Sequence, residues 1–307
     1  MSDAPETGYY GRPIVKEAPW AAAEIAGYLF LGGLAGASSV LAAGADLTGR
    51  PALARPLKRT AFGAITVSLV ALVHDLGRPA RFLNMLRVFK PTSPMSVGVW
   101  LLSAYAPAAG AAAASEATGI LPAVGRAATA GAALLGPAVA SYTGVLLSDT
   151  AVPAWHDGHR EMPYVFVGSA ATAAAGTGLV AAPLDENAPA RRLAAIGAVA
   201  ELAAAEVMKR RMGMVAEPYS RGRAGVLMHA GEALTLLGAG GALALGRRSR
   251  LGAVASGAAL LAASAFTRFG IFEAGRQSAR DPRYVVEPQR ARRAGGEPSG
   301  FPPAGAG

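Results

Sequence analysis

Residues 20–45 read WAAAEIAGYLFLGGLAGASSVLAAGA, and Glu24 is the one charged residue in that run. A helix of about 20 predominantly apolar residues is long enough to cross the hydrocarbon core of a bilayer. Glycine and alanine are abundant here, as they are where membrane helices pack closely together. This stretch therefore predicts a membrane-spanning helix that packs tightly against its neighbours.

Further stretches of the chain repeat this apolar pattern, although the one at 193–207 holds Glu201 and Glu206. The whole chain is 52% hydrophobic and only 16% charged, which is too apolar for an ordinary soluble domain. We therefore predict an all-α fold, a polytopic integral membrane bundle of about eight transmembrane helices. The further stretches lie approximately at 60–73, 94–115, 121–147, 162–182, 193–207, 224–245 and 251–272.

The predicted organisation has three parts. Residues 1–19 are an N-terminal interfacial segment, which lacks the apolar core and cleavage site of a signal peptide. Residues 20–280 form the transmembrane domain. Residues 281–307 are rich in Arg, Gly, Pro and Glu and predict a disordered polar tail.

The net charge of +9 arises from basic residues in the short loops and in the tail. Loops of membrane proteins ordinarily carry such orienting charge, so the basic balance does not indicate a nucleic-acid partner. Eight spans place both termini on one side, which also holds more Lys and Arg than the other side. The bias predicts a multi-pass protein of the cell membrane with cytoplasmic termini.

The chain contains no cysteine, so it has no thiolate ligand for a metal or an iron–sulfur cluster. Its four histidines all lie near the membrane surface on the side of the termini, which does not provide facing pairs of haem ligands. No phosphate-binding loop, zinc spacing or hydrolase motif stands out. We predict no metal site, no bound haem or iron–sulfur cluster, and no catalytic residues of a hydrolase in this chain.

The first span carries polar side chains on one helix face. Trp20, Glu24 and Tyr28 recur every four residues, so they stack near one membrane surface. A tryptophan and a tyrosine are ordinary interfacial residues, but a carboxylate inside a span normally faces protein or water. Glu24 is therefore a candidate functional residue, with Tyr28 beside it.

Two further candidates lie at the ends of spans near the same surface. His74 and Asp75 end the second span, where Arg78 and Arg81 could pair with the carboxylate, either to anchor the loop or to support proton transfer. Tyr142 stands seven residues before Asp149, on the same helix face, and its hydroxyl could donate to a ligand carbonyl or simply pack against a neighbouring helix.

The later spans also contain ionisable residues. We expect them to pair across helices as a structural network, with a proton path as the alternative. They are Glu201 and Glu206, His229 and Glu232, and Arg268 with Glu273.

Several motifs, in their order along the chain, resemble the NrfD family, which is the polysulfide reductase membrane-subunit (PsrC-like) family. The resemblance extends to about Tyr284. The motifs are YYGRP at 9–13, LFLGGLAG at 29–36, HDLGRP at 74–79 followed by Arg81 and Phe82, SPMS at 93–96 with Trp100, Tyr142-Thr143-Gly144, and FEAGR at 272–276.

This resemblance implies an eight-helix subunit of a multi-subunit oxidoreductase in a bacterial cytoplasmic membrane. It implies that the subunit carries no redox cofactor and exchanges electrons with a membrane quinone, either menaquinone or ubiquinone. The implied partners are a ferredoxin-like iron–sulfur subunit and a molybdopterin catalytic subunit, and the implied quinone pocket lies among the first four helices.

On this basis Tyr142 and His74 are expected to hold the quinone head, while Glu24 and Asp75 carry protons. Arg78 and Arg81 would orient Asp75 or receive the partner subunit. Two other functions fit the sequence: a stand-alone ion or solute transporter that uses the buried charges, and a passive membrane anchor without a working quinone site.

Overall fold

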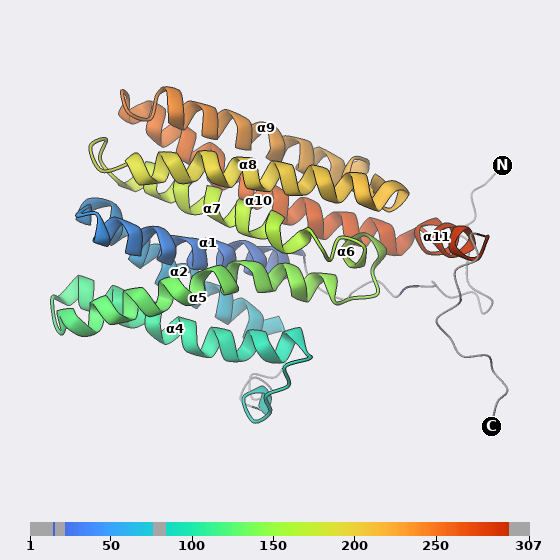
Figure 1. Cartoon of the computed structure of the whole chain (residues 1–307), viewed down its shortest axis with the longest axis horizontal. Helices are drawn as coiled ribbons and strands as arrows, with labels where there is room; N and C mark the ends of the chain where they lie inside the picture. The colour runs from blue at the N-terminus through green and yellow to red at the C-terminus, as the bar shows by residue number, and fades with distance from the viewer. Residues whose placement is uncertain (1–14, 16–21, 76–83, 295–307) are drawn as a thin grey trace.

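The computed structural model of the chain describes residue 15, residues 22–75 and residues 84–294, and the side chains of 22–24, 75 and 291–294 lie outside the description. Within these ranges the regular structure is helical, so the predicted all-α fold is confirmed. The long helices run side by side along the length of the molecule (Figure 1). They are α1 (Ala22–Leu47), α2 (Pro51–Asp75), α4 (Pro94–Thr118), α5 (Pro122–Ser148), α7 (Met162–Ala181), α8 (Ala188–Met212), α9 (Gly222–Ala244) and α10 (Arg250–Arg280).

Seven of these described helices are long and apolar enough to cross a membrane, and α8 is the exception. Its composition is polar because Arg191 and Arg192 lie near its start and Lys209, Arg210 and Arg211 near its end. The outward face between these ends still exposes apolar side chains such as Ile196 and Val199. Helix α8 packs against α7 and α9 within the bundle (Figure 1). The chain is therefore a polytopic membrane bundle, with eight as the approximate count of spans.

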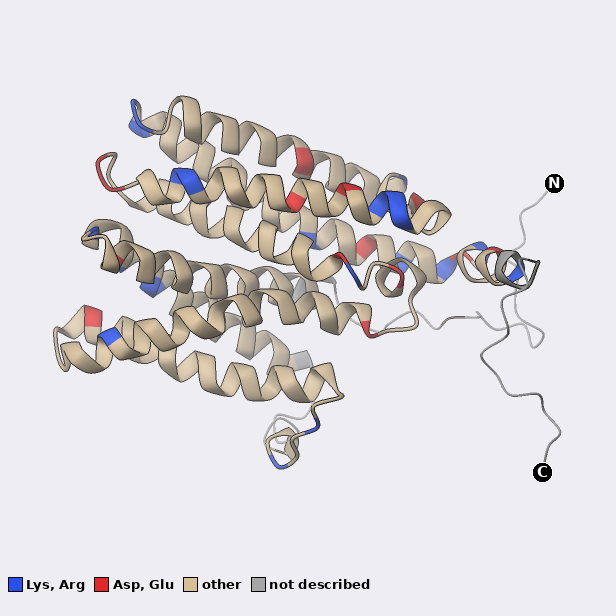
Figure 2. Ribbon diagram, in the orientation of Figure 1, with Lys and Arg blue, Asp and Glu red and all other residues tan. Residues whose placement is uncertain are grey.

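The bundle consists of two groups of four helices. The first group contains α1, α2, α4 and α5, and the second contains α7, α8, α9 and α10 (Figure 1). Helix α1 packs on α7 and α10, and α5 also packs on α7, so these contacts join the two groups. Charged side chains gather mainly toward the two ends of the bundle, while the middle is mostly uncharged (Figure 2).

Glycine allows the closest helix crossing in the first group. A Cβ on Gly36 of α1 would lie 2.4 Å from the backbone oxygen of Gly136 on α5, and the reverse distance is the same. No side chain fits between backbones at that separation, which explains the small residues in this part of α1. The neighbouring Gly33 faces the second group, since a Cβ there would lie 3.2 Å from Ala170 on α7.

Helix α2 begins at Pro51, nine residues before the start that the sequence predicts. The predicted span started late because the first turns of the helix carry Arg55, Lys58 and Arg59 and are not apolar. These side chains find partners at the end of the bundle opposite to the start of α1. Lys58 pairs with Asp46 at 2.6 Å, and Arg55 and Arg59 each lie 3.3 Å from Glu116. The ion pairs let a charged segment continue as a helix beyond the apolar part.

The predicted disordered tail contains a helix, α11 (Arg283–Ala294), which starts three residues after α10 ends. Its first turn is tied to the short helix η1 (Gly213–Tyr219). Arg283 and the hydroxyl of Tyr284 bond to the carboxylate of Glu217 at 2.6 and 3.0 Å. These contacts are tertiary, and the composition of the tail does not reveal them.

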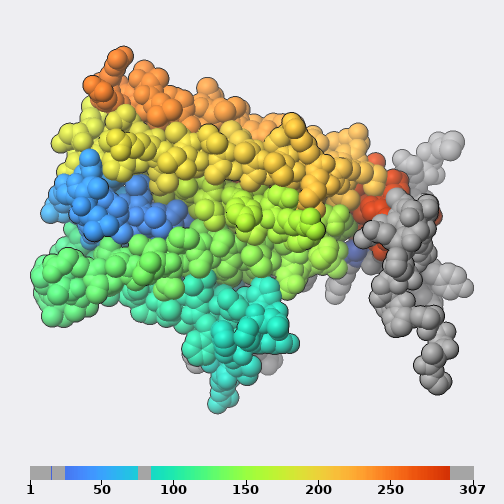
Figure 3. All heavy atoms as spheres, in the orientation of Figure 1, coloured from blue at the N-terminus to red at the C-terminus, as the bar shows by residue number. Residues whose placement is uncertain are grey.

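The described part of the connection between α2 and α4 projects from the side of the bundle (Figure 3). It is held at its C-terminal end, where the Trp100 indole donates to the carbonyl of Val88 at 3.4 Å and packs edge-on against Phe89. Ser96 bonds to the same carbonyl at 3.2 Å and accepts from the backbone N–H of Lys90 at 3.0 Å.

Candidate functional site

A small cavity lies within the first helix group, between α1, α2, α4 and α5. Its volume is about 50 Å³. We call it the inner cavity, and its wall consists almost wholly of apolar side chains and two tyrosines. The lining residues are Tyr28, Leu72, Met85, Met95, Val99, Leu102, Tyr142 and Leu146.

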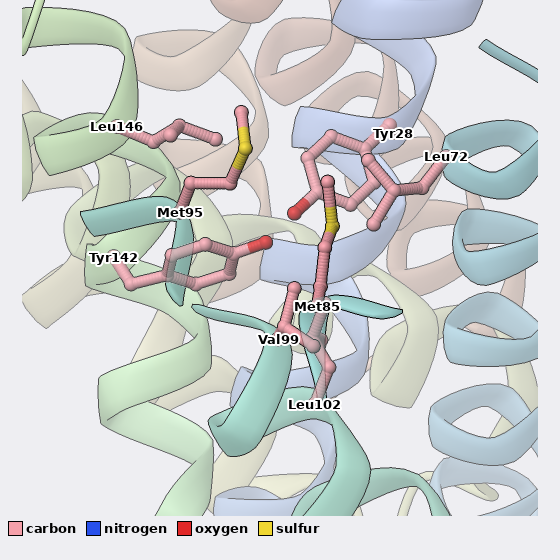
Figure 4. A pocket seen from close by; sticks show the side chains of 8 residues that line it. All are labelled: Tyr28, Leu72, Met85, Met95, Val99, Leu102, Tyr142 and Leu146. Atoms are coloured by element: carbon pink, nitrogen blue, oxygen red, sulfur yellow. The ribbon is translucent and has the colours of Figure 1, made fainter. Parts of the chain in front are cut away.

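The two tyrosines enter the inner cavity from opposite walls. Tyr28 belongs to α1 and Tyr142 to α5, and both hydroxyl groups point toward the space between the rings (Figure 4). Tyr28 is 2% exposed, and its hydroxyl has no hydrogen-bond partner among the described residues. A buried hydroxyl without a partner costs free energy, so this group is available to a ligand that enters the cavity.

The ring of Tyr142 lies against α4 at a glycine. A Cβ on Gly98 would meet the Cε2 atom of this ring at 2.3 Å and the Cδ2 atom at 2.9 Å. Glycine at this position therefore leaves the space that the ring occupies. Tyr142 is buried, and the position of its hydroxyl in the cavity depends on this contact.

A second cavity continues from the first toward the end of the bundle where α1 begins. Its volume is about 340 Å³, and we call it the outer cavity. It shares Tyr28, Leu72, Met95 and Leu146 with the inner cavity, so the two are adjacent. Its other lining residues are Ile25, Leu29, Ser93, Leu147, Asp149 and Thr150.

The outer cavity is adjacent in turn to a surface cleft of about 570 Å³, with Asp149 and Thr150 lining both. Polar side chains also line the cleft, namely His156 of α6 (Pro153–His156), Asp157 directly after this helix, and Tyr284 of α11. The three spaces form a series from two buried tyrosine hydroxyls to an exposed polar surface.

Cavity size limits what each part can hold. A water molecule needs roughly 10–15 Å³ of such volume, so the inner cavity accommodates only a few waters as it stands. Small organic ligands occupy pockets of about 300–1,000 Å³, a range that includes the outer cavity. A ring that reached both tyrosines would occupy the inner and outer cavities together. Met85 and Met95 line the inner cavity, and methionine side chains adapt readily to such a change.

The structure places Tyr28 and Tyr142 in the wall of one cavity. None of the other predicted site residues is among the described residues that line this cavity. Glu24 lies on α1 one turn before Tyr28, and Asp75 is the last residue of α2, but both side chains are outside the described part of the chain. Arg78 and Arg81 also lie outside the described residues. His74 is exposed at the end of α2, two residues after the lining residue Leu72.

Sequence reasoning did not assign Asp149 to the site, although it noted that Asp149 lies on the same helix face as Tyr142. In the structure Asp149 caps α5 and lines both the outer cavity and the surface cleft. The spacing of seven residues was the signal that pointed to it. Met95 and Ser93 were quoted only as parts of a motif, and they too line the cavities.

A charged cluster stabilises the same end of the bundle. Arg211, at the end of α8, donates to the two carboxylate oxygens of Glu161 at 2.6 and 2.7 Å and to the backbone carbonyl of Asp157. These hydrogen bonds hold the pKa of the Glu161 carboxyl below its ordinary value. The segment between α6 and α7, which forms part of the surface cleft, is thereby fixed to α8.

The ionisable residues of the second group, which were expected to pair across helices, do so in part and otherwise pair within one helix. Glu232 pairs with Lys209 at 2.9 Å, and Glu206 pairs with Arg210 at 2.6 Å. Glu273 lies 3.7 Å from Arg276 on its own helix. Arg268 reaches across to α7, where its guanidinium donates to the backbone carbonyl of Phe166 at 2.7 Å and not to a carboxylate.

The family model described as polysulphide reductase NrfD matches residues 15–216 of the chain. The chain belongs to the NrfD family. The matched residues include α1 to α8 and therefore every helix that lines the inner cavity. Among curated proteins, none matches the chain as a relative.

Membership of the NrfD family makes this protein a multi-pass membrane subunit of a quinone-linked oxidoreductase of the polysulphide reductase type. The resemblance inferred from the motifs is thus confirmed. The family model ends at residue 216, so α9 and α10, which complete the second group, lie outside the match.

Proposed function

We propose that this NrfD subunit binds the head of a membrane quinone, menaquinone or ubiquinone, in the inner and outer cavities. There it passes electrons between the quinone and an iron–sulfur partner. The observation that supports the proposal most directly is the pair of tyrosine hydroxyls directed into one buried space (Figure 4). Phenolic hydroxyls donate hydrogen bonds well to carbonyl oxygens, which are the polar atoms of a quinone.

The wall of the cavities fits the rest of such a ligand. Leucine, isoleucine, valine and methionine side chains make up most of the lining, and they suit a ring and a hydrocarbon tail. The Tyr28 hydroxyl would gain in the bound state the hydrogen bond that it lacks in this structure.

Reduction of a quinone consumes two electrons and two protons and converts both carbonyl groups to hydroxyl groups. In our proposal the electrons come from the partner, or return to it when the quinol is oxidised. Glu24 and Asp75 carry the protons, and His74 assists at the end of α2. Asp149 extends this set, because it lies where the outer cavity meets the surface cleft.

The partner is proposed to be a ferredoxin-like iron–sulfur subunit that docks at the end of the bundle with the surface cleft, and a molybdopterin subunit would complete the complex. The series of cavities leads from the tyrosines to that surface, which supports docking of the electron-transferring partner there. Arg78 and Arg81 would contribute to docking or orient Asp75.

The test uses the assembled complex in its native membrane. Tyr28→Phe and Tyr142→Phe each remove one hydroxyl without changing the ring, and Asp75→Asn removes one proton carrier. We expect quinone-linked turnover to fall by about tenfold or more in each variant. A hydrogen bond to a group that carries or develops charge contributes about 1.5 kcal/mol or more, and that energy is lost.

Tyr105→Phe is the matched control, because Tyr105 is a buried tyrosine of α4 whose hydroxyl bonds to Ser39 at 2.7 Å, away from the cavities. Its turnover should stay near that of the native protein. Unchanged turnover in both Tyr28→Phe and Tyr142→Phe, with normal assembly, would instead identify the chain as a passive anchor.

A further inference from the structure

A second polar cluster lies in the other helix group, and none of its residues lines the surface cleft or the two cavities. Its centre is Glu201 on α8, a residue that is only 3% exposed. The side chain of Glu201 faces α7 and α10. The hydroxyl of Thr267 on α10 donates to one carboxylate oxygen at 2.8 Å, and Thr172 on α7 lies 3.3 Å from the other. The carboxyl group is therefore enclosed by helices and not by lipid.

The hydrogen-bond geometry around Thr172 suits a carboxyl group that carries a proton. The Thr172 hydroxyl lies 2.8 Å from the carbonyl oxygen of Ser169, a shorter contact than the 3.3 Å to Glu201, so we assign its single hydrogen to the Ser169 carbonyl. A hydroxyl that donates to one group still has a lone pair to accept from another. The oxygen of Thr172 can thus accept a hydrogen bond from protonated Glu201, while Thr267 continues to donate to the opposite oxygen.

A fixed positive charge borders the cluster. Arg268 follows Thr267 on α10, is fully buried, and stacks its guanidinium over the ring of Phe166 at 3.7 Å from the ring centre. One terminal nitrogen donates to the Phe166 carbonyl at 2.7 Å, but Nε and the other terminal nitrogen have no hydrogen-bond partner among the described residues. A buried cation with unused donors attracts a negative charge nearby, and Glu201 is the acidic side chain that it influences.

We propose that Glu201 is a proton-binding site of this protein, separate from the quinone cavity, in which the ligand is a proton taken from water. Binding adds the proton to a carboxylate oxygen of Glu201, which forms one O–H bond there, and the new hydroxyl donates a hydrogen bond to the oxygen of Thr172 while Arg268 stays charged. The groups that face the carboxyl are the hydroxyls of Thr172, Thr267 and Ser169 and the guanidinium of Arg268. The site would exist even if the quinone proposal failed.

The site touches the first helix group through α1. A Cβ on Gly33 would lie 3.2 Å from a terminal nitrogen of Arg268, and Gly33 follows Tyr28 by five residues on the same helix. Five residues correspond to about 7.5 Å along a helix axis. A change of charge at Glu201 therefore acts close to the helix that lines the inner cavity.

The test is infrared spectroscopy of the purified full chain in lipid nanodiscs, titrated with acid and base. A protonated carboxyl group has a carbonyl stretch that an ionised one lacks. We expect one such band to disappear as the pH rises, to be missing in Glu201→Gln, and to remain in Glu206→Gln. Glu206 is the matched control because it lies on the same helix but is half exposed and paired with Arg210.

If Glu201→Gln fails to fold, variants of the groups around the carboxyl test the same site. Thr267→Val should shift the frequency of the band, because it removes the donor to the carboxyl oxygen. Arg268→Gln should move the titration midpoint upward by on the order of one pH unit, and Arg268→Lys should restore it. A band that persists in Glu201→Gln, does not titrate, or ignores both Thr267→Val and Arg268→Gln would overturn the proposal.

Discussion

The aromatic ring of Tyr142 on α5 occupies the place where a Cβ on Gly98 of α4 would stand, with 2.3 Å between that Cβ position and Cε2 of the ring. Real Cβ atoms essentially never approach other heavy atoms so closely. A small residue on one helix thus determines where the hydroxyl on the other lies, although the two residues are 44 positions apart in the chain.

Gly98→Ala should therefore weaken quinone binding. The added methyl group pushes the ring out of its position, so the hydroxyl no longer reaches the inner cavity, and we expect the Kd for a short-chain quinone to rise about tenfold. Overpacking should also lower the free energy of unfolding by about 1–3 kcal/mol. Equilibrium binding in nanodiscs and denaturant unfolding measure the two effects.

Gly131→Ala on α5 is the control, because a Cβ there meets nothing within 4 Å. It should bind quinone normally and be slightly more stable, since alanine favours a helix. Equal effects of the two substitutions on binding would contradict the proposed role of Gly98.

Tyr28→Phe should separate stability from binding. The hydroxyl of Tyr28 is buried without a partner among the described residues, so its removal should leave the free energy of unfolding unchanged or raise it. Tyr105→Phe instead breaks the 2.7 Å bond to Ser39 and should destabilise the protein by about 1 kcal/mol. Quinone affinity should instead fall in Tyr28→Phe and stay unchanged in Tyr105→Phe. A destabilised Tyr28→Phe with full affinity would show that the hydroxyl has a structural role.

Leu146→Trp should block ligand access, because Leu146 lines both the inner and the outer cavity. The larger ring fills space that the quinone head needs, so we expect binding to fall below detection in a titration that measures the native protein. Leu134→Trp on the same helix is the control, since Leu134 is 82% exposed on the outer surface. If both variants bind quinone as the native protein does, the head does not enter through the outer cavity.

Glu161 provides a pH-dependent contribution to stability. Its pKa is lowered in the folded protein by the hydrogen bonds from Arg211, so its ion pair stabilises the fold above the unfolded value of 4.5. That stability is lost as the pH falls through the lowered pKa. The difference in unfolding free energy between the native protein and Glu161→Gln should be constant near neutral pH and shrink below about pH 4.5. A difference that does not change with pH would exclude this ion pair as the cause.

The bundle itself could be predicted from the sequence because membrane spans need long apolar runs, which are visible without tertiary information. Two parts of the fold depend on distant contacts and could not be predicted. The first turns of α2 are charged, and their partners Asp46 and Glu116 lie on other helices. Helix α11 lies in a polar tail, and its first turn bonds to Glu217.

In the candidate site, too, some features could be predicted from the sequence and others depend on contacts between distant residues. Tyr28 and Tyr142 were chosen from the sequence for different reasons, and only the packing of α1, α4 and α5 places them around one cavity. The role of Gly98 could not be predicted, since nothing in the sequence shows which side chain faces a glycine on another helix. Pairing across helices was predicted for the ionisable residues of the later spans, but the sequence does not show which partner each one finds. Glu232 pairs with Lys209, and the Arg268 guanidinium contacts Phe166.

The most direct measurement of the central claim is photolabelling of the intact complex with a quinone that carries a light-activated group on its ring, followed by mapping of the labelled peptides. We expect label on the cavity walls, at residues 25–29 of α1, at residues 93–102 around the start of α4, and at residues 142–150 at and just beyond the end of α5. Excess unmodified quinone should remove it. Label confined to exposed positions such as Val226 and Leu237 of α9, or label that unmodified quinone does not displace, would contradict a quinone site between the two tyrosines.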